Sequence, residues 1–179
     1  MANLILNGST SGSVTLSSPA VSGTTTLTLP AQTGTVMVNG PAFRAIASAS
    51  QSFTNGTWAK ITLGTEAWDT NNNFDSTTNY RFTPTVAGYY QVNGGYSFQG
   101  TASAGYTLIT SIYKNGSELI RGAEMYSLTA TFNQSVVNGV VYMNGSTDYI
   151  ELYALVAGGS ASTGDTILCF MDATLVRSA

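Results

Sequence analysis

The side chains that could do chemistry in this sequence are few and scattered. Its 179 residues include no histidine, one cysteine, nine acidic residues and six basic residues. Catalysis by proton transfer or by an activated nucleophile usually depends on histidine or on another group that titrates near neutral pH. We therefore expect a protein that holds, caps or binds something, and not an enzyme.

The candidate metal ligands are Asp69, Asp75 and Asp165, which lie in stretches rich in Asn, Thr and Gly. Oxygen-rich loops of this kind can bind Ca²⁺, which takes roughly six to eight oxygen ligands. Asp and Asn are also the usual residues of turns, and we favour that interpretation. A glycoside hydrolase would need two carboxylates on either side of a cleft, and the scattered acidic residues do not predict such a pair. No metal and no cofactor is expected.

Cys169 is the single thiol, within an apolar stretch that predicts a strand over residues 166–176. It has no partner for a disulfide within the chain. With no histidine to act as its base, we expect Cys169 to behave as a small buried hydrophobic residue.

Charge and hydropathy argue against two classes of partner. The net charge is −3 and the basic residues form no stripe that could neutralise phosphates, so nucleic acid is not expected. No apolar run approaches the roughly 20 residues that span a bilayer, and the N-terminus lacks the pattern of a signal peptide. We expect no membrane insertion and synthesis in a cytoplasm.

The composition divides the chain into residues 1–40 and residues 41–179. Residues 1–40 contain no charged side chain and no aromatic ring. They form short alternating pieces that predict strands with one apolar face, and these pieces are too small to form a core of their own. Either the segment buries its apolar residues against another chain, which we favour, or it is disordered. The predicted attachment residues are Leu4, Leu6, Val14, Leu16, Leu27 and Leu29.

Residues 41–179 predict an all-β domain of about eight to ten strands. In residues 88–99 apolar and polar side chains alternate, which is typical of a strand with one core face. Asn115-Gly116 lies between two alternating runs and predicts a type I′ hairpin, because both central positions of that turn need positive φ. Asn55-Gly56 and Asn144-Gly145 suggest the same type of turn. The spacing indicates a β-sandwich or jelly roll.

Two predicted strands, residues 148–155 and 166–176, are apolar on both faces. A sandwich needs only one apolar face per strand, and a second one would expose a patch that soluble monomers avoid. We expect a subunit interface there; the alternative is that loops or the N-terminal segment cover the face in a monomer. The predicted interface residues are Tyr149, Tyr153, Leu155 and Phe170.

Trp58 and Trp68 are candidate contacts for a glycan, because an aromatic face can stack on a sugar ring. They lie in loop-rich stretches. The same rings could instead anchor the connections between the first strands, and we favour anchoring.

Part of the sequence resembles the complement q-type and tumour-necrosis-factor-like jelly rolls. Phe82 is followed after five residues by Gly88-Tyr89-Tyr90-Gln91-Val92, which is similar to the central-strand signature of that family, with Val92 replacing its final aromatic residue. Lys114-Asn115-Gly116 is similar to a frequent hairpin of the family. The resemblance covers residues 42–179 and implies a ten-stranded jelly roll that forms a tight homotrimer. The apical calcium sites of the family have no matching acidic loop here.

The N-terminal segment is similar to a segment of tailed-bacteriophage virion proteins. The similarity lies in residues 7–16, followed by Thr26-Leu27-Thr28-Leu29-Pro30-Ala31 and Gly34-Thr35-Val36. Together the two resemblances imply a virion structural protein, assembled in the host cytoplasm, with a trimeric head and an attachment segment that contacts other virion proteins. A short fibre or appendage on the tail, neck or head surface is favoured. A capsid-decoration or cement protein and a host-glycan binding module are the alternatives.

Overall fold

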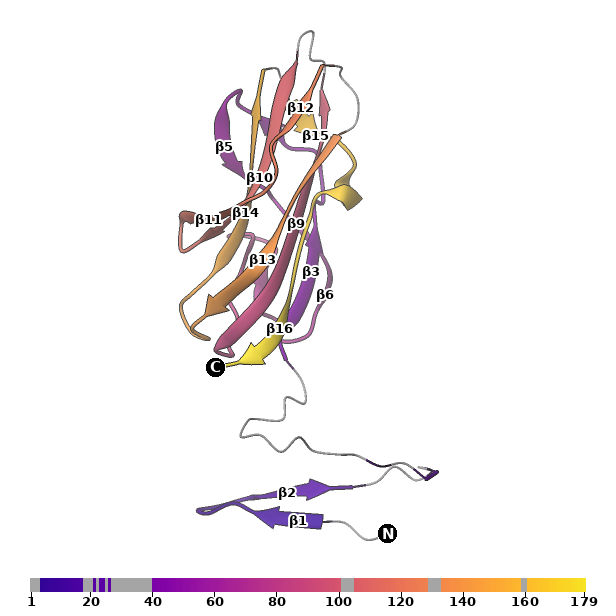
Figure 1. The fold of residues 1–179 in the computed structure, drawn as a ribbon, viewed down its shortest axis with the longest axis vertical. Helices are drawn as coiled ribbons and strands as arrows, with labels where there is room; N and C mark the ends of the chain where they lie inside the picture. The colour runs from indigo at the N-terminus through magenta and orange to yellow at the C-terminus, as the bar shows by residue number, and fades with distance from the viewer. Residues whose placement is uncertain are drawn as a thin grey trace. The chain divides into compact units, whose positions relative to one another are not determined.

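The computed structural model of the chain describes residues 4–17, 21, 23, 24, 26, 40–100, 105–128, 133–158 and 161–179. The chain divides into two compact units, Met1–Gly34 and Thr35–Ala179. Figure 1 shows the strands of both units.

The first unit contains an antiparallel hairpin of β1 (Leu4–Asn7) and β2 (Ser13–Leu16). Leu4 pairs with Leu16 and Leu6 with Val14, so these four apolar side chains share one face. Every residue of both strands is exposed. The hairpin therefore has an apolar face with nothing packed on it in the described part of the chain, while Leu27 and Leu29 lie outside the described residues.

The second unit is a sandwich of two antiparallel sheets, each of seven strands. The β9 sheet has the order β4-β15-β9-β16-β3-β6, with β13 also paired to β9. Its strands are β3 (Ala42–Ile46), β4 (Ser52–Phe53), β6 (Thr65–Asp69), β9 (Gly88–Gly100), β13 (Asn133–Met143), β15 (Ala161–Thr163) and β16 (Phe170–Ser178).

The β10 sheet has the order β11-β10-β14-β8-β7, with β12 paired to β10 and β5 paired to β14. Its strands are β5 (Thr57–Lys60), β7 (Phe74–Asp75), β8 (Arg81–Phe82), β10 (Tyr106–Lys114), β11 (Ser117–Arg121), β12 (Met125–Ser127) and β14 (Ile150–Ala157). Many consecutive strands lie in opposite sheets, as in a jelly roll, and Figure 1 shows the long strands running along the length of the unit. Several strands have only two or three residues, so the described unit has more than the ten strands expected.

The core lies between the two sheets and follows the alternation in the sequence. On β9 the side chains of Tyr90, Val92, Tyr96 and Phe98 are completely buried, as the pattern in residues 88–99 predicts. On β14 the inward side chains are likewise buried: Ile150, Leu152, Ala154 and Val156. Aromatic rings join the sheets at one end of the core, where Phe43 stacks on Phe82 with ring centroids 4.4 Å apart.

The hairpin predicted at Asn115-Gly116 is confirmed. Asn115 has φ 52° and Gly116 φ 79°, and the turn joins the adjacent strands β10 and β11. The other two Asn-Gly pairs differ from the prediction, because in each only the glycine has positive φ. Asn55-Gly56 joins β4 to β5 and Asn144-Gly145 joins β13 to β14, so both turns cross between the sheets and neither forms a hairpin.

The strand predicted over residues 166–176 begins later than expected. A short 3₁₀ helix, η1 (Thr166–Leu168), precedes β16. The Asp165 carboxylate accepts a hydrogen bond of 3.0 Å from the Ile167 amide and caps this turn. Ile167 is consequently 63% exposed, while Cys169 at the end of the turn is buried.

Replacing Gly94 with valine should destabilise the second unit. A Cβ at Gly94 would collide with Leu152 Cδ1 and lie 3.3 Å from Val137 Cγ1, in the middle of the core. Overpacking of this kind costs about 1–3 kcal/mol. Urea unfolding of Gly94→Val should show the loss, and Ser117→Val, at an exposed strand position, serves as the control. Equal unfolding midpoints for Gly94→Val and the native chain would contradict this account of the core.

Candidate functional site

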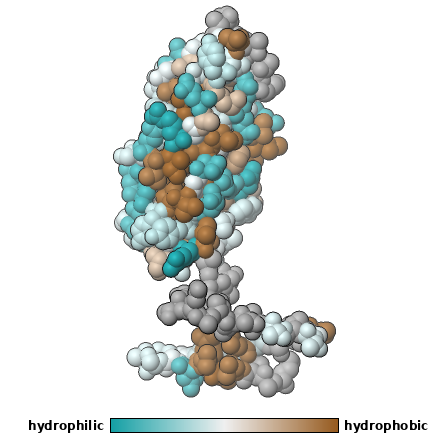
Figure 2. All heavy atoms as spheres, viewed as in Figure 1, coloured by the Kyte–Doolittle hydropathy of each residue, from teal (hydrophilic) through white to brown (hydrophobic). Residues whose placement is uncertain are grey.

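One outer surface of the sandwich, on the β9 sheet, carries a group of exposed apolar side chains, here called the apolar face. These side chains are each 44–57% exposed: Tyr89 on β9, Val136, Val140 and Tyr142 on β13, and Val176 on β16. Tyr89 and Tyr142 are register partners with ring centroids 5.4 Å apart. Figure 2 shows hydrophobic side chains gathered where Figure 1 places β13 and the neighbouring edge at β11. Soluble monomers rarely expose a contiguous group of this kind.

A row of paired polar side chains crosses the same outer surface. Arg44 Nη1 donates to Asp172 Oδ2 at 2.7 Å, and Asn93 Nδ2 donates to Asp172 Oδ1 at 2.8 Å. The Arg44 guanidinium also lies 4.4 Å from the centre of the Phe170 ring. Because these groups already satisfy one another, a partner could cover them without leaving an unpaired charge.

A shallow hollow adjoins the apolar face at the edge of the sandwich. It is lined by Lys114, Leu119, Ile120, Val140, Val141 and Tyr142. Lys114 Nζ donates to the Tyr142 carbonyl at 2.7 Å and forms an ion pair of 2.8 Å with Asp148. The hydrogen bonds from Lys114 and then Asn115 lower the pKa of Asp148. The hollow thus has an apolar floor and a fixed cation beside it.

The predicted interface residues do not form one surface. Tyr149 precedes β14, and Tyr153 and Leu155 lie on it in the β10 sheet, whereas Phe170 begins β16 in the β9 sheet. All four are half-buried. Alternation along each strand identifies an outward side chain, but it does not say which of the two sheets the strand joins.

The apolar face itself was missed in the sequence, although the same signal was present there. In β13 the buried side chains include Val137, Val141 and Met143, while Val136, Val140 and Tyr142 point outward. This strand is therefore apolar on both faces, like the strands predicted over residues 148–155 and 166–176.

The two candidate glycan contacts lie on different sheets. Trp58 is half-buried on β5, opposite Leu155 of β14, and its ring lies 6.1 Å from that of Tyr113. Trp68 is 45% exposed on β6, opposite Arg44 of β3. The structure therefore does not combine them into a single site.

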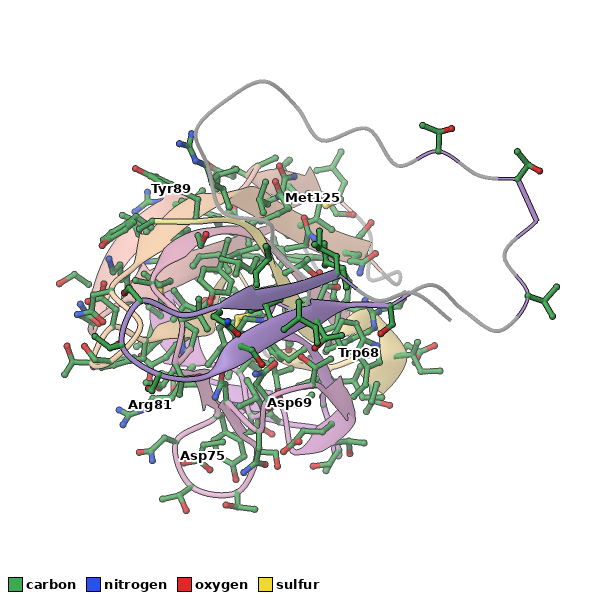
Figure 3. The ribbon with its side chains drawn as sticks, turned by 90° about the horizontal axis from the view of Figure 1, so that it is seen from below. Trp68, Asp69, Asp75, Arg81, Tyr89 and Met125 are labelled. Carbon is green, nitrogen blue, oxygen red and sulfur yellow. The ribbon has the colours of Figure 1, made fainter. Side chains whose placement is uncertain are left out.

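The loop carboxylates are engaged in turns. Asp69 accepts from the amides of Asn71 at 3.2 Å and Phe74 at 2.7 Å. Asp75 accepts from the amides of Thr77, Thr78 and Asn79 at 2.9–3.1 Å, and these bonds, with that from Thr78 the largest cause, hold the pKa of Asp75 well below its usual range. In Figure 3 both aspartates lie away from Tyr89.

Within the described ranges, no group of three or more His, Cys, Asp or Glu side chains is placed to hold a metal ion. In the same ranges, no helix has the length and apolar character needed to cross a membrane.

Cys169 is buried beside β9, where the Ser97 amide donates to Sγ at 3.3 Å. Burial raises the pKa of this thiol to about 11. At neutral pH the group is therefore a protonated, inaccessible thiol, which agrees with the interpretation of Cys169 as a small hydrophobic residue.

Four of the predicted attachment residues form the apolar side of the β1–β2 hairpin, which is separate from the apolar face of the β9 sheet. Leu4, Leu6, Val14 and Leu16 are 52–62% exposed. An isolated two-stranded hairpin is at best marginally stable in water. Packing another surface against the apolar side of this hairpin would therefore stabilise it.

Comparisons with solved structures establish the fold. No protein-family model matches the sequence, and no curated protein matches it. The globular domain of zebrafish complement 1qA protein is 15% identical, over 78% of this chain and 99% of its own, with a TM-score of 0.55. Murine APRIL at pH 5.0 is 9% identical, over 77% of this chain and 100% of its own, with a TM-score of 0.57.

Eiger TNF from S. frugiperda is 11% identical, over 78% of this chain and 93% of its own, with a TM-score of 0.54. Identities this low show the fold alone. The second unit is a jelly-roll sandwich of the C1q and TNF type, as the Phe82 and Gly88 signature predicted.

The Asp75 turn should stabilise the protein in a pH-dependent way. Because folding lowers the pKa of Asp75 from 3.8, its contribution is fully present above pH 3.8 and is lost as pH falls from there through the folded pKa. We expect Asp75→Ala to lower the free energy of unfolding by about 1 kcal/mol at pH 7. In urea unfolding this deficit should narrow below pH 3.8.

Asp75→Asn is the matched control, because its side-chain oxygen can still accept from the turn amides and it should lose less stability at pH 7. A deficit for Asp75→Ala that stays constant down to pH 2.5 would contradict the assignment.

Proposed function

We propose that this chain is a non-enzymatic structural protein of a tailed-bacteriophage virion, a trimeric short fibre or appendage anchored to the particle by its first unit. The single observation that carries the proposal is the apolar face, because it calls for a partner of matching shape. The similarity of residues 7–36 to phage virion proteins supports the setting.

Three copies of the second unit are the partners that best fit the apolar face. The resemblance to complement q-type and tumour-necrosis-factor-like jelly rolls implies a threefold assembly. Burying Tyr89, Val140 and Tyr142 between copies would remove their apolar surface from water, at roughly 25 cal/mol for each Å². Phe170 and its Arg44 partner lie on the same outer surface and would join this interface. Tyr149, Tyr153 and Leu155, in the other sheet, would not share it.

The hairpin of the first unit supports the anchoring role. The hairpin has no charged side chain, and its apolar side is exposed along both strands. Edge strands with unpaired backbone groups can add to the sheet of another chain. Side-chain burial and backbone pairing would together hold the appendage on a virion protein.

The first test is the oligomeric state in solution. Analytical ultracentrifugation of the full chain at micromolar concentration should give about three times the 18.7 kDa chain mass. Val140→Glu should dissociate the trimer, because three carboxylates would enter one apolar interface. Tyr126→Glu, at a 67% exposed position in the β10 sheet, should leave it intact.

A native chain that sediments as a stable, well-dispersed single-chain species would contradict the proposal. Circular dichroism spectra should show that Val140→Glu keeps the native strand content.

The second test is incorporation into particles. The double variant Leu6→Lys, Leu16→Lys places two charges on the apolar side of the hairpin. It should reduce the amount of the protein on particles at least tenfold, as measured by quantitative immunoblotting of purified virions. Thr15→Lys changes the opposite face of the same strand and should have a much smaller effect. Equal amounts of the double variant and the native chain on particles would reject the anchoring role while leaving the trimer test unaffected.

A further inference from the structure

Three aromatic side chains meet on the outer surface of the β10 sheet, whereas the apolar face belongs to the β9 sheet. They are Trp58 on β5, Tyr113 on β10 and Tyr153 on β14, named here the aromatic platform. The rings of Tyr113 and Tyr153 are stacked, with centroids 4.0 Å apart and planes at 23°. The ring of Trp58 lies 6.1 Å from that of Tyr113 at 58°. All three side chains are half-buried, so they form a fixed surface with parts of each ring open to solvent.

The polar tips of the platform have no hydrogen-bond partner in the described part of the chain. Within the described residues, no hydrogen bond involves the hydroxyls of Tyr113 and Tyr153 or the indole N–H of Trp58. Burial, as the largest cause, raises the pKa of both tyrosines. The two hydroxyls are therefore protonated at neutral pH and can both donate and accept.

Paired charges border the platform. Arg121 donates from Nε and Nη2 to the two carboxylate oxygens of Glu118 at 2.7 and 2.5 Å, and Ser111 Oγ donates to Glu118 at 2.9 Å. The Arg121 guanidinium lies 5.4 Å from the centre of the Trp58 ring. On β5, Lys60 forms an ion pair of 2.8 Å with Glu151, and Lys60 is the register partner of Tyr153.

These features match one chemical class of ligand. The two carboxylates that border the platform, Glu118 and Glu151, each pair with a cation, and the surface offers donors and acceptors at short spacing beside aromatic rings. A sugar has an apolar C–H face that packs on a ring and hydroxyls that both donate and accept. We propose that the aromatic platform is a binding site for a neutral saccharide.

A saccharide explains the platform better than a protein partner does. The platform residues are half-buried and bordered by ion pairs, whereas the more exposed large apolar side chains of the same sheet, Leu119 and Tyr126, lie outside the platform on β11 and β12. Protein interfaces concentrate apolar area at a charge-depleted centre. The platform and the apolar face lie on opposite layers of the sandwich, so the platform does not depend on the trimer for its geometry.

The test uses the full-length chain on a microarray of purified bacterial surface polysaccharides together with maltohexaose, cellohexaose and chitohexaose. We expect binding to at least one neutral glycan, and titration of that glycan followed by tryptophan fluorescence should give its affinity. Trp58→Ala should weaken binding about tenfold or more, because tryptophan is one of the residue types that most often form binding hot spots. Trp68→Ala, at the exposed tryptophan of the other sheet, should bind like the native chain.

Tyr113→Phe and Tyr153→Phe keep the stacked rings and remove one hydroxyl each, so they should fold normally and weaken binding several-fold. Absence of glycan binding, native affinity in Trp58→Ala and both phenylalanine variants, or equal loss in Trp68→Ala would each overturn the proposal. Binding restricted to acidic glycans and abolished by salt would also overturn it. A failed incorporation or trimer test has no bearing on these outcomes.

Discussion

The second unit depends on burial of one face of its long strands between two sheets. Tyr90, Val92 and Phe98 on β9 meet Leu152 and its neighbours on β14, and every one of these side chains is completely buried. Successive side chains of a strand point to opposite faces, so only every second side chain can pack in the core. The remaining side chains must either be polar or find a partner outside the sandwich, and the two sheets resolve this differently.

The sequence predicts whatever depends on neighbours along the chain. The core face of β9 and the positive φ of Asn115 and Gly116 follow from local alternation and turn chemistry, and both are present. The sheet to which a strand belongs depends on pairing across long separations, and alternation carries no information about it. Phe170 and Tyr153 were therefore grouped in one interface although they lie in different sheets. The meeting of Trp58 with Tyr113 needs the pairings β5–β14 and β10–β14, which no local pattern encodes.

Aspartate in a loop can either bind a cation or stabilise a turn, and its hydrogen bonds show which role the structure supports. Asp69, Asp75 and Asp165 lie in loops with the composition of a calcium site, yet each carboxylate accepts from backbone amides two to five positions away. These hydrogen bonds give each carboxylate a role within its own turn, as expected for Asp in loops. The turn interpretation therefore follows from geometry that composition could not supply.

The two outer surfaces differ in how their polar groups are satisfied, and this difference separates their roles. On the β9 sheet, Asp172 takes hydrogen bonds from both Arg44 and Asn93, so the polar groups between the apolar side chains are already paired and tolerate loss of water. On the β10 sheet, Glu118 and Glu151 are paired, but the tips of Trp58, Tyr113 and Tyr153 have no hydrogen-bond partner among the described residues, so complete burial under an apolar partner would cost hydrogen bonds to water. A surface of the first kind suits assembly between copies. One of the second kind suits a small polar ligand that brings its own hydroxyls, and for this reason we propose assembly through one layer and saccharide binding through the other.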